Sequence, residues 1–339
     1  MSAFLDTLSA QAPDPDHPRI TLAVPVKDPD DRMFTACLQS LLRQPFLPYC
    51  EILVLDSSAR PVPAFEAFRG IIRVAPLTRR YLSGARQDIL DQARGEAIAG
   101  IDVDCVAEPG WLAALVAPLD RERGIAASVG HNLPAAHTKA SDWFQDAYED
   151  WGRHVSAPIG KTRYMFTIDM KNYAVYTDIA REIGFDDNLK ATEDHDFATR
   201  LRRKGYHIVY APGAEIRHRN RETFPGLLRQ QAWHGFGYGQ NVAKNDFDIH
   251  CQRPFYHLVK QGIFLVIFPL FVLKLLKVSM QAGWTWRAVK AYLTAWAVDC
   301  RFKMGVLRGM RHQGGWRYIA KRFLSDVFSV CWETTITRL

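Results

Sequence analysis

The feature that most constrains this fold is an alternation of short apolar runs with amphipathic segments in the first hundred residues. The runs 20–26, 51–55 and 97–101 each have the length and apolarity of a buried strand. The segments 34–42 and 83–93 carry apolar residues at helical spacing. Strands that alternate with helices predict an α/β fold with a mostly parallel, doubly wound, Rossmann-like sheet flanked by helices.

Acidic residues follow three of these predicted strands. Asp28 comes after the first, Asp56 closes the second, and the pair Asp102 and Asp104 follows the third. Ligands of open α/β sheets bind beyond the carboxyl ends of the strands, where an Asp-x-Asp pair can hold a hard divalent cation and, through it, a diphosphate. A solvated turn is the alternative, because aspartate favours turns.

The glycine-rich loops that usually bind nucleotides are missing. The sequence has no G-x-G-x-x-G after the first strand and no G-x-x-x-x-G-K-[ST] anywhere. Their absence argues against a dinucleotide dehydrogenase and a P-loop enzyme. A bound nucleotide would therefore be held by acidic side chains and a metal ion.

A second acidic pair, Glu193 and Asp194, lies at the predicted start of a helix that continues into a basic stretch. A carboxylate in such a position can act as a general base that removes the proton of an attacking hydroxyl group. Acidic neighbours and partial burial would raise the pKa of such a carboxylate towards that of a useful base. An ordinary helix N-cap, with Thr192 before acidic residues, is the structural alternative.

The order of these motifs resembles that of family 2 glycosyltransferases of the GT-A fold. The matching stretches are VPVKD, EILVLDSS, GARQDILDQARGE, IDVDCVAEPGWL and ATEDHD, which spread over residues 19–240. The resemblance implies an inverting enzyme of the kind that bacteria use for exopolysaccharide or envelope-glycan synthesis. Its donor would be a nucleotide diphosphate sugar, and its cofactor a divalent metal, Mn²⁺ or Mg²⁺.

The resemblance also assigns roles to single residues. Asp194, with Glu193, would be the catalytic base of the E-D motif. Nucleotide-sugar binding would fall to Asp28, Asp56, Arg86, Asp102, Arg229, Trp233 and His234, and metal binding to Asp104, Asp102 and His218. His218 lies among arginines, so a solvated histidine is the alternative there.

Three departures from the family pattern limit what the resemblance implies. Ser57-Ser58 replaces Asp-Gly after the second strand, and Met170-Lys171-Asn172 stands where glycines are usual beside the donor sugar. The helix at 223–240 has Arg229-Gln230-Gln231-Ala232-Trp233 in place of Q-x-x-R-W. The last departure argues against a processive polymer synthase and for the transfer of a single sugar.

The charge is divided along the chain. The net charge is +7, but residues 253–339 carry 14 Lys or Arg against 3 acids, and five of the nine tryptophans. Basic residues interleaved with Trp suit an anionic membrane surface, and the neighbouring apolar run makes lipid a better partner than nucleic acid. That run, 263–273, has 11 residues, short of the roughly 20 that a crossing needs, so an interfacial or re-entrant helix is expected, with a buried core helix as the alternative.

Three parts are therefore expected: a flexible N-terminus at 1–18, a GT-A domain at 19–245, and a basic, Trp-rich, helical membrane-associating region at 250–339. The first residues lack a secretory signal, and the six cysteines form no metal or disulfide pattern. We expect the enzyme at the cytoplasmic face of the membrane, with a lipid-linked or saccharide acceptor. The rival classes are a non-catalytic membrane-bound scaffold of glycosyltransferase descent and a sugar-phosphate nucleotidyltransferase.

Overall fold

The structure is a computed structural model of the 339-residue chain. It describes residues 3–135, 164–219, 223–245, 297–298 and 300–320. The chain divides into two compact units, one of residues 1–135 and 156–220, the other of residues 136–155 and 221–339. The first unit contains the sheet, and the second contains the long helix α8 (Phe224–Asn245).

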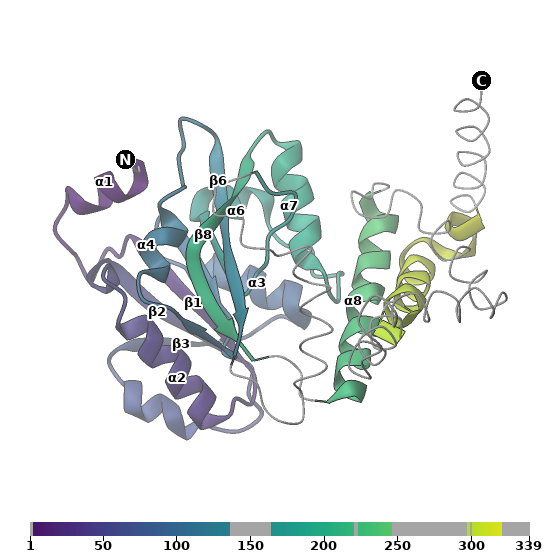
Figure 1. The fold of residues 1–339 in the computed structure, drawn as a ribbon, viewed down its shortest axis with the longest axis horizontal. Helices are drawn as coiled ribbons and strands as arrows, with labels where there is room; N and C mark the ends of the chain where they lie inside the picture. The colour runs from purple at the N-terminus through teal and green to yellow at the C-terminus, as the bar shows by residue number, and fades with distance from the viewer. Residues whose placement is uncertain (1–2, 136–163, 220–222, 246–296, 299, 321–339) are drawn as a thin grey trace, which may run out of the picture. The chain divides into compact units, whose positions relative to one another are not determined.

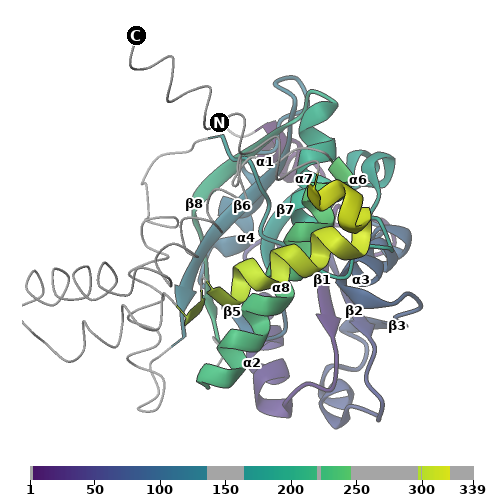
Figure 2. The same cartoon turned by 90° about the vertical axis from the view of Figure 1, so that its right-hand side faces the viewer.

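The first unit is built on one eight-stranded, curled sheet whose strands are ordered β3-β2-β1-β4-β7-β6-β8-β5 (Figures 1 and 2). Four neighbouring pairs are parallel and three, β4–β7, β6–β7 and β5–β8, are antiparallel. The strands are β1 Ile20–Val26, β2 Cys50–Asp56, β3 Ile72–Pro76, β4 Ala97–Ile101, β5 Cys105–Ala107, β6 Ile125–Pro134, β7 Asn172–Tyr176 and β8 His207–His218.

Helices cover the sheet because their apolar residues face it. The strands β4 and β7 are buried along their whole length, as expected of strands covered on both faces. Helix α2 packs against β5, α3 against β2, α4 against β6, β7 and β8, and α7 against β8. The helices of this unit are α1 Ala3–Ser9, α2 Asp31–Leu42, α3 Tyr81–Gln92, α4 Trp111–Val116, α6 Thr177–Ile183 and α7 Glu193–Arg203, with 3-10 turns η1 Leu47–Tyr49 and η2 Pro63–Phe68.

The apolar runs of the sequence predict β1, β2 and β4 to within a residue, and the α/β class is confirmed. The sheet is mixed, however, because β7 runs antiparallel between β4 and β6. The strands β5 and β7 were not expected, and they have only three and five residues. Part of the N-terminus that was expected to be flexible forms α1, whose Phe4 and Leu8 are buried in the core of this unit.

A buried side-chain amide at the start of β7 joins this strand to β6 and β8. Asn172, at the start of β7, is fully buried and accepts a hydrogen bond of 2.8 Å from Trp111 Nε1. Its Nδ2 donates to the carbonyl oxygens of His131 and Ala214. Because a Cβ at Gly130 would lie 2.3 Å from the Asn172 amide, this position of β6 accepts only glycine without a shift. The amide therefore fixes the start of β7 against β6 and β8.

In the second unit, α8 and the helical residues 300–320 cross at very short range (Figures 1 and 2). A Cβ added at Gly239 would lie 2.0 Å from the Val306 oxygen, and one at Gly309 would lie 1.8 Å from the Phe236 oxygen. Beside the glycines, apolar side chains form a small core of Tyr238, Val242, Val306, Met310 and Ile319. The small residues let the two backbones approach closely.

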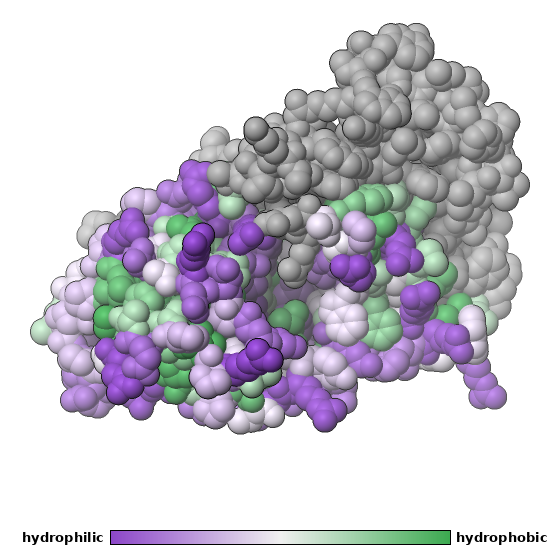
Figure 3. Space-filling model, turned by 90° about the horizontal axis from the view of Figure 1, so that it is seen from below, coloured by the Kyte–Doolittle hydropathy of each residue, from purple (hydrophilic) through white to green (hydrophobic). Residues whose placement is uncertain are grey.

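Most of the predicted membrane-associating region, 250–339, lies outside the described residues, including the apolar run 263–273. Among the described residues, no helix combines the length and the apolarity that a bilayer crossing requires. In the space-filling view, the described surface is mainly hydrophilic, with separate hydrophobic areas (Figure 3). The exposed large hydrophobic side chains include Ile71, Val74, Leu82, Phe166 and Trp316.

Candidate active site

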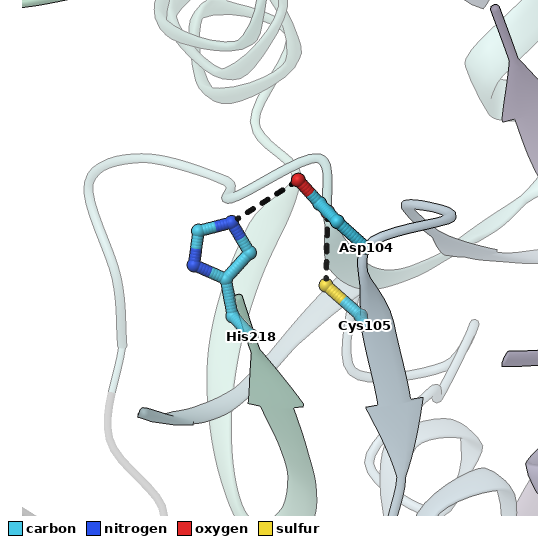
Figure 4. A group of neighbouring side chains, drawn as sticks. All are labelled: Asp104, Cys105 and His218. Carbon is cyan, nitrogen blue, oxygen red and sulfur yellow. Dashed lines mark hydrogen bonds and ion pairs between the residues drawn. The ribbon is translucent and has the colours of Figure 1, made fainter. Parts of the chain in front are cut away.

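The residues Asp104 and His218 meet because β5 pairs with β8. The antiparallel register places Cys105 opposite His218, so the residue before β5 and the last residue of β8 are neighbours. His218 Nε2 lies 3.6 Å from Asp104 Oδ2 (Figure 4). The backbone of Asp104 is held as well, since its carbonyl accepts a hydrogen bond from Arg219 N at 3.0 Å.

These side chains form a candidate metal centre. One ligand atom each from Asp104, Cys105 and His218 lies within 4.8 Å of the others. A carboxylate and a neutral imidazole suit a Mn²⁺-like ion, whereas a thiol suits softer metals. Cys105 is buried, and its thiol donates to Asp104 Oδ1 at 3.6 Å. Burial and the charges of Asp104 and Asp102 raise the pKa of this thiol. The donor set that fits a hard divalent cation is therefore Asp104 with His218.

Asp102, which was expected to serve both the metal and the nucleotide, binds a buried arginine. Arg86 Nη2 on α3 donates to Asp102 Oδ1 at 2.8 Å, and Arg86 Nε lies 4.0 Å from Glu193 Oε1. The Arg86 side chain is 3% exposed, and its Nε and Nη1 have no hydrogen-bond partner within the described parts of the chain. Arg86 thus joins the Asp-x-Asp stretch to the E-D pair.

The guanidinium of Arg86 keeps its charge in this position. Although burial lowers the pKa of Arg86, the charges of Asp102 and Glu193 and the hydrogen bond to Asp102 raise it further, with a net increase. Burial raises the pKa of the Tyr173 hydroxyl to about 12, so the neighbouring phenol stays neutral. A charged guanidinium therefore lies between the carboxyl groups of Asp102 and Glu193.

Glu193 and Asp194 begin α7, as the sequence predicts. Thr192 adopts a left-handed backbone with φ 57°, and its hydroxyl donates to the Ala191 carbonyl and does not cap the helix. An ordinary Thr N-cap therefore does not explain this stretch. Left-handed backbone at a threonine is uncommon and is often found at functional sites.

Both acids have raised pKa values. Burial, with the charge of Asp194, raises the pKa of Glu193 to about 7. Burial, with the charge of Asp169, raises the pKa of Asp194 to about 6, against the hydrogen bond that Asp194 Oδ1 accepts from His195 N at 2.8 Å. A carboxylate with a pKa near neutrality is suited to accept a proton under physiological conditions.

Asp169 and Lys171 are site residues that the sequence reasoning did not select. Asp169 Oδ2 accepts hydrogen bonds from Asn132 Nδ2 at 2.7 Å and from the Lys171 ammonium. Lys171 N donates to Asp169 Oδ1 at 3.2 Å. The only sequence feature that pointed to this turn was the departure from the family pattern at Met170-Lys171-Asn172.

Two predicted nucleotide-sugar residues lie at neighbouring strand ends: Asp28 in the loop after β1, and Asp56 as the last residue of β2. Asp28 has a left-handed backbone with φ 43°, and its Oδ1 accepts a hydrogen bond from Ala59 N at 2.9 Å. Asp56 Oδ1 accepts from Ser58 N, and Ser58 Oγ accepts from Asp28 N, both at 2.9 Å. Ser57-Ser58, which replaces Asp-Gly, thus ties the two acidic loops together.

The other predicted nucleotide-sugar residues, Arg229, Trp233 and His234, lie on α8 in the second unit. Trp233 is 42% exposed and stacks on Phe236 with ring centroids 5.8 Å apart. The role predicted for these three residues stays a prediction.

A curled α/β sheet with an acidic pair after one strand and a second at a helix start defines a GT-A-like glycosyltransferase. The family model described as glycosyl transferase family 2 matches residues 23–169, and the model of glycosyl transferase family group 2 matches residues 97–319. The second match covers more than half of the chain. This protein therefore belongs to glycosyl transferase family group 2 and is a glycosyltransferase.

Two solved structures resemble the chain. The mannosyltransferase PcManGT from Pyrobaculum calidifontis, in complex with GDP-Man and Mn²⁺, matches with a TM-score of 0.52 and 17% identity over 96% of this chain and 92% of its own. GalNAc-T7 with UDP, GalNAc and Mn²⁺ matches with a TM-score of 0.49 and 15% identity over 69% of this chain. The chain spans 52% of the GalNAc-T7 chain. No curated protein matches the sequence. The likeness to the mannosyltransferase supports the fold.

Proposed function

We propose that this glycosyltransferase transfers one sugar, with inversion, from a nucleotide diphosphate sugar to an acceptor hydroxyl, with Asp194 as the general base. The observation that carries the proposal is the connection of the two acidic motifs. Arg86 bridges Asp102 and Glu193, so one buried side chain supports both the Asp-x-Asp stretch and the E-D pair that contains the base. Such a support keeps reacting groups in a fixed geometry, which inverting displacement requires.

Asp194 takes the acceptor proton in the transfer step. The acceptor oxygen forms a bond to the anomeric carbon while the bond from that carbon to the phosphate oxygen breaks. The bonding electron pair leaves with the nucleoside diphosphate, and the proton goes to a carboxylate oxygen of Asp194. The raised pKa of Asp194, about 6, makes it a stronger base than an ordinary aspartate while it stays mostly ionised near neutral pH.

Asp104 and His218 would hold the divalent cation, Mn²⁺ or Mg²⁺, near Asp102. When bound, the cation offsets the negative charge that develops on the departing diphosphate. The mannosyltransferase neighbour binds Mn²⁺ and GDP-Man, which supports a metal and a nucleotide sugar for this chain as well. We place the nucleoside beside Asp28 and Asp56, at the ends of β1 and β2.

The acceptor that we propose is a lipid-linked saccharide at the cytoplasmic face of the membrane, in the synthesis of an exopolysaccharide or another envelope glycan. The support is the charge of residues 253–339, which carry 14 basic residues against 3 acids and five tryptophans. Such a composition favours an anionic lipid surface.

The test is release of nucleoside diphosphate from a panel of nucleotide sugars, with Mn²⁺ or Mg²⁺ and with membrane lipid extract as the source of acceptor. We expect release from one donor, which EDTA abolishes and Mn²⁺ restores. Asp194→Asn and Asp104→Asn should each lower the rate at least about a hundredfold. Glu182→Gln, on the surface of α6, is the control and should keep the wild-type rate. Full activity in Asp194→Asn would overturn the assignment of the base.

A further inference from the structure

We propose that Asp169 and Lys171 form a preassembled pair that binds vicinal hydroxyls of the donor sugar and selects the sugar. The inference rests on the proposed function and names residues that determine donor specificity. It comes from the position, charge and hydrogen bonding of a turn that lies between the metal-side carboxylates and the base.

The position follows from the register of the sheet. The antiparallel pairing of β4 with β7 places Ile101 opposite Asn172. The residues that follow Ile101 and precede Asn172, Asp102 and Lys171, therefore lie on adjacent chains at the same edge. The ammonium of Lys171 interacts electrostatically with Asp102, on the metal side.

The chain that leads to the other member of the pair, Asp169, runs beside the start of α7, since Thr167 Oγ1 lies 3.5 Å from His195 Nδ1. The charge of Asp169 acts on the carboxyl of Asp194, and that of Lys171 acts on it with the opposite sign. In an inverting transfer, the sugar ring lies between the diphosphate and the base, because the acceptor attacks from the side opposite to the leaving group. We therefore place Asp169 and Lys171 beside the part of the site between these two groups.

The turn is held rigidly before any ligand arrives. The Asp169 carboxylate accepts hydrogen bonds from Asn132 at 2.7 Å, from the backbone N of Lys171 at 3.2 Å, and from the Lys171 ammonium. The Asp169 carbonyl accepts from Asn172 N at 2.9 Å, and Asn172 is itself fixed in the core. A site that is ordered in advance loses less entropy when it binds.

Enough of the pair is accessible for a ligand to reach it. The Lys171 side chain is 25% exposed and that of Asp169 is 36% exposed. Burial raises the pKa of Asp169, but the Lys171 ammonium lowers it further, so the carboxyl stays ionised. A carboxylate accepts two hydrogen bonds from neighbouring hydroxyls, and an ammonium donates to their oxygens. An adjacent acceptor and donor therefore match two vicinal hydroxyl groups.

The test is binding of the donor identified in the panel, and of analogues that each lack one hydroxyl, by calorimetry in the presence of Mn²⁺. For wild-type protein, removal of one of the two recognised hydroxyls should weaken binding about tenfold. Lys171→Met and Asp169→Asn should each bind the natural donor about tenfold more weakly than the wild type does. Within each variant, an analogue that lacks a recognised hydroxyl should bind less than about threefold more weakly than the natural donor.

Binding of the nucleoside diphosphate alone separates a sugar contact from a general electrostatic effect. We expect its Kd to change less than about twofold in Lys171→Met, since the pair contacts the sugar. Lys204→Met, which removes another lysine that pairs with a carboxylate, Glu182, is the matched control and should bind every ligand as the wild type does. Thermal unfolding of each variant verifies that it is folded.

The proposal would be overturned if removal of a hydroxyl from the donor weakened its binding to Lys171→Met as much as its binding to the wild type. A Kd for nucleoside diphosphate that weakens as much as that of the donor would also overturn it, because Lys171 would then act on the phosphates. Either result leaves the proposed function intact. Failure of the wild-type protein to bind any nucleotide sugar would instead overturn both.

Discussion

Arg86 Nη2 donates a 2.8 Å hydrogen bond to Asp102 Oδ1 from a side chain that is 3% exposed. Its Nε lies 4.0 Å from Glu193 Oε1. One buried cation on α3 therefore touches both acidic motifs, which are about ninety residues apart in the sequence. The relationship explains why an Asp-x-Asp stretch and an E-D pair form a single site. It implies that Arg86 acts by positioning Asp102 and Glu193.

Arg86→Met should destabilise the protein by about 3 kcal/mol, because it leaves the buried Glu193 without its cation. Urea unfolding monitored by Trp fluorescence measures the change in the free energy of unfolding. Arg69→Met removes an ion pair with Glu66 in which both side chains are more than two-thirds exposed, 77% and 70%, and should cost at most about 1 kcal/mol. Equal effects of the two substitutions would refute the bridging role.

The activity should rise with pH through about 6, the raised pKa of Asp194. Asp194 accepts a proton only when it is ionised, so the rate should fall about tenfold for each pH unit below that value and level off above about pH 7. Because Glu193 titrates nearby, the midpoint belongs to the pair. Initial rates from about pH 4.5 to pH 8.5 test this. A flat profile across this range would contradict the assignment of Asp194 as the base.

The metal requirement should depend on Asp104 and His218. Asp104→Asn and His218→Gln should each raise the Mn²⁺ concentration for half-maximal activity at least about tenfold. Even the loss of residues that only orient metal ligands lowers metal affinity by this factor. Cys105→Ala should change this concentration less than about threefold, because hard cations prefer oxygen and nitrogen ligands. A shift in Cys105→Ala as large as in His218→Gln would show that the thiolate is a ligand.

The close crossing in the second unit should tolerate no added methyl group. A Cβ at Gly309 would lie 1.8 Å from the Phe236 oxygen, so Gly309→Ala should lower the free energy of unfolding by about 1–3 kcal/mol. Gln313→Ala, at an exposed position of the same helix, should change it by less than about 0.5 kcal/mol. Thermal unfolding compares the two. Indistinguishable melting temperatures would mean that the helices do not pack as described.

The parts of the fold that could be predicted from sequence are those with a strong local signal. The runs that form β1, β2 and β4 are long and apolar enough to be recognised without tertiary context. The strand β5 has only three residues, and both β5 and β7 are defined by their pairing with neighbouring strands. Register with β8, which no local pattern encodes, brings His218 to Asp104.

The acidic residues of the site could be predicted from the sequence, whereas their buried and charged partners could not. Asp102 and Asp104 were candidates because ligands of open α/β sheets bind beyond the carboxyl ends of the strands, and Glu193 and Asp194 because a carboxylate at a helix start can serve as a base. Arg86 was expected to bind the nucleotide sugar, yet its burial and its two carboxylate partners follow from packing of α3 that the sequence does not reveal. The Asp169–Lys171 pair was overlooked because a turn of this type has no periodic signature.

The anomeric configuration of the first-formed product tests the central claim most directly. Nuclear magnetic resonance can record it before mutarotation, with either the acceptor or water as the nucleophile. Attack opposite the diphosphate, with Asp194 as base, predicts a product of inverted configuration that Asp194→Asn does not form. A product that retains the configuration of the donor would contradict the account.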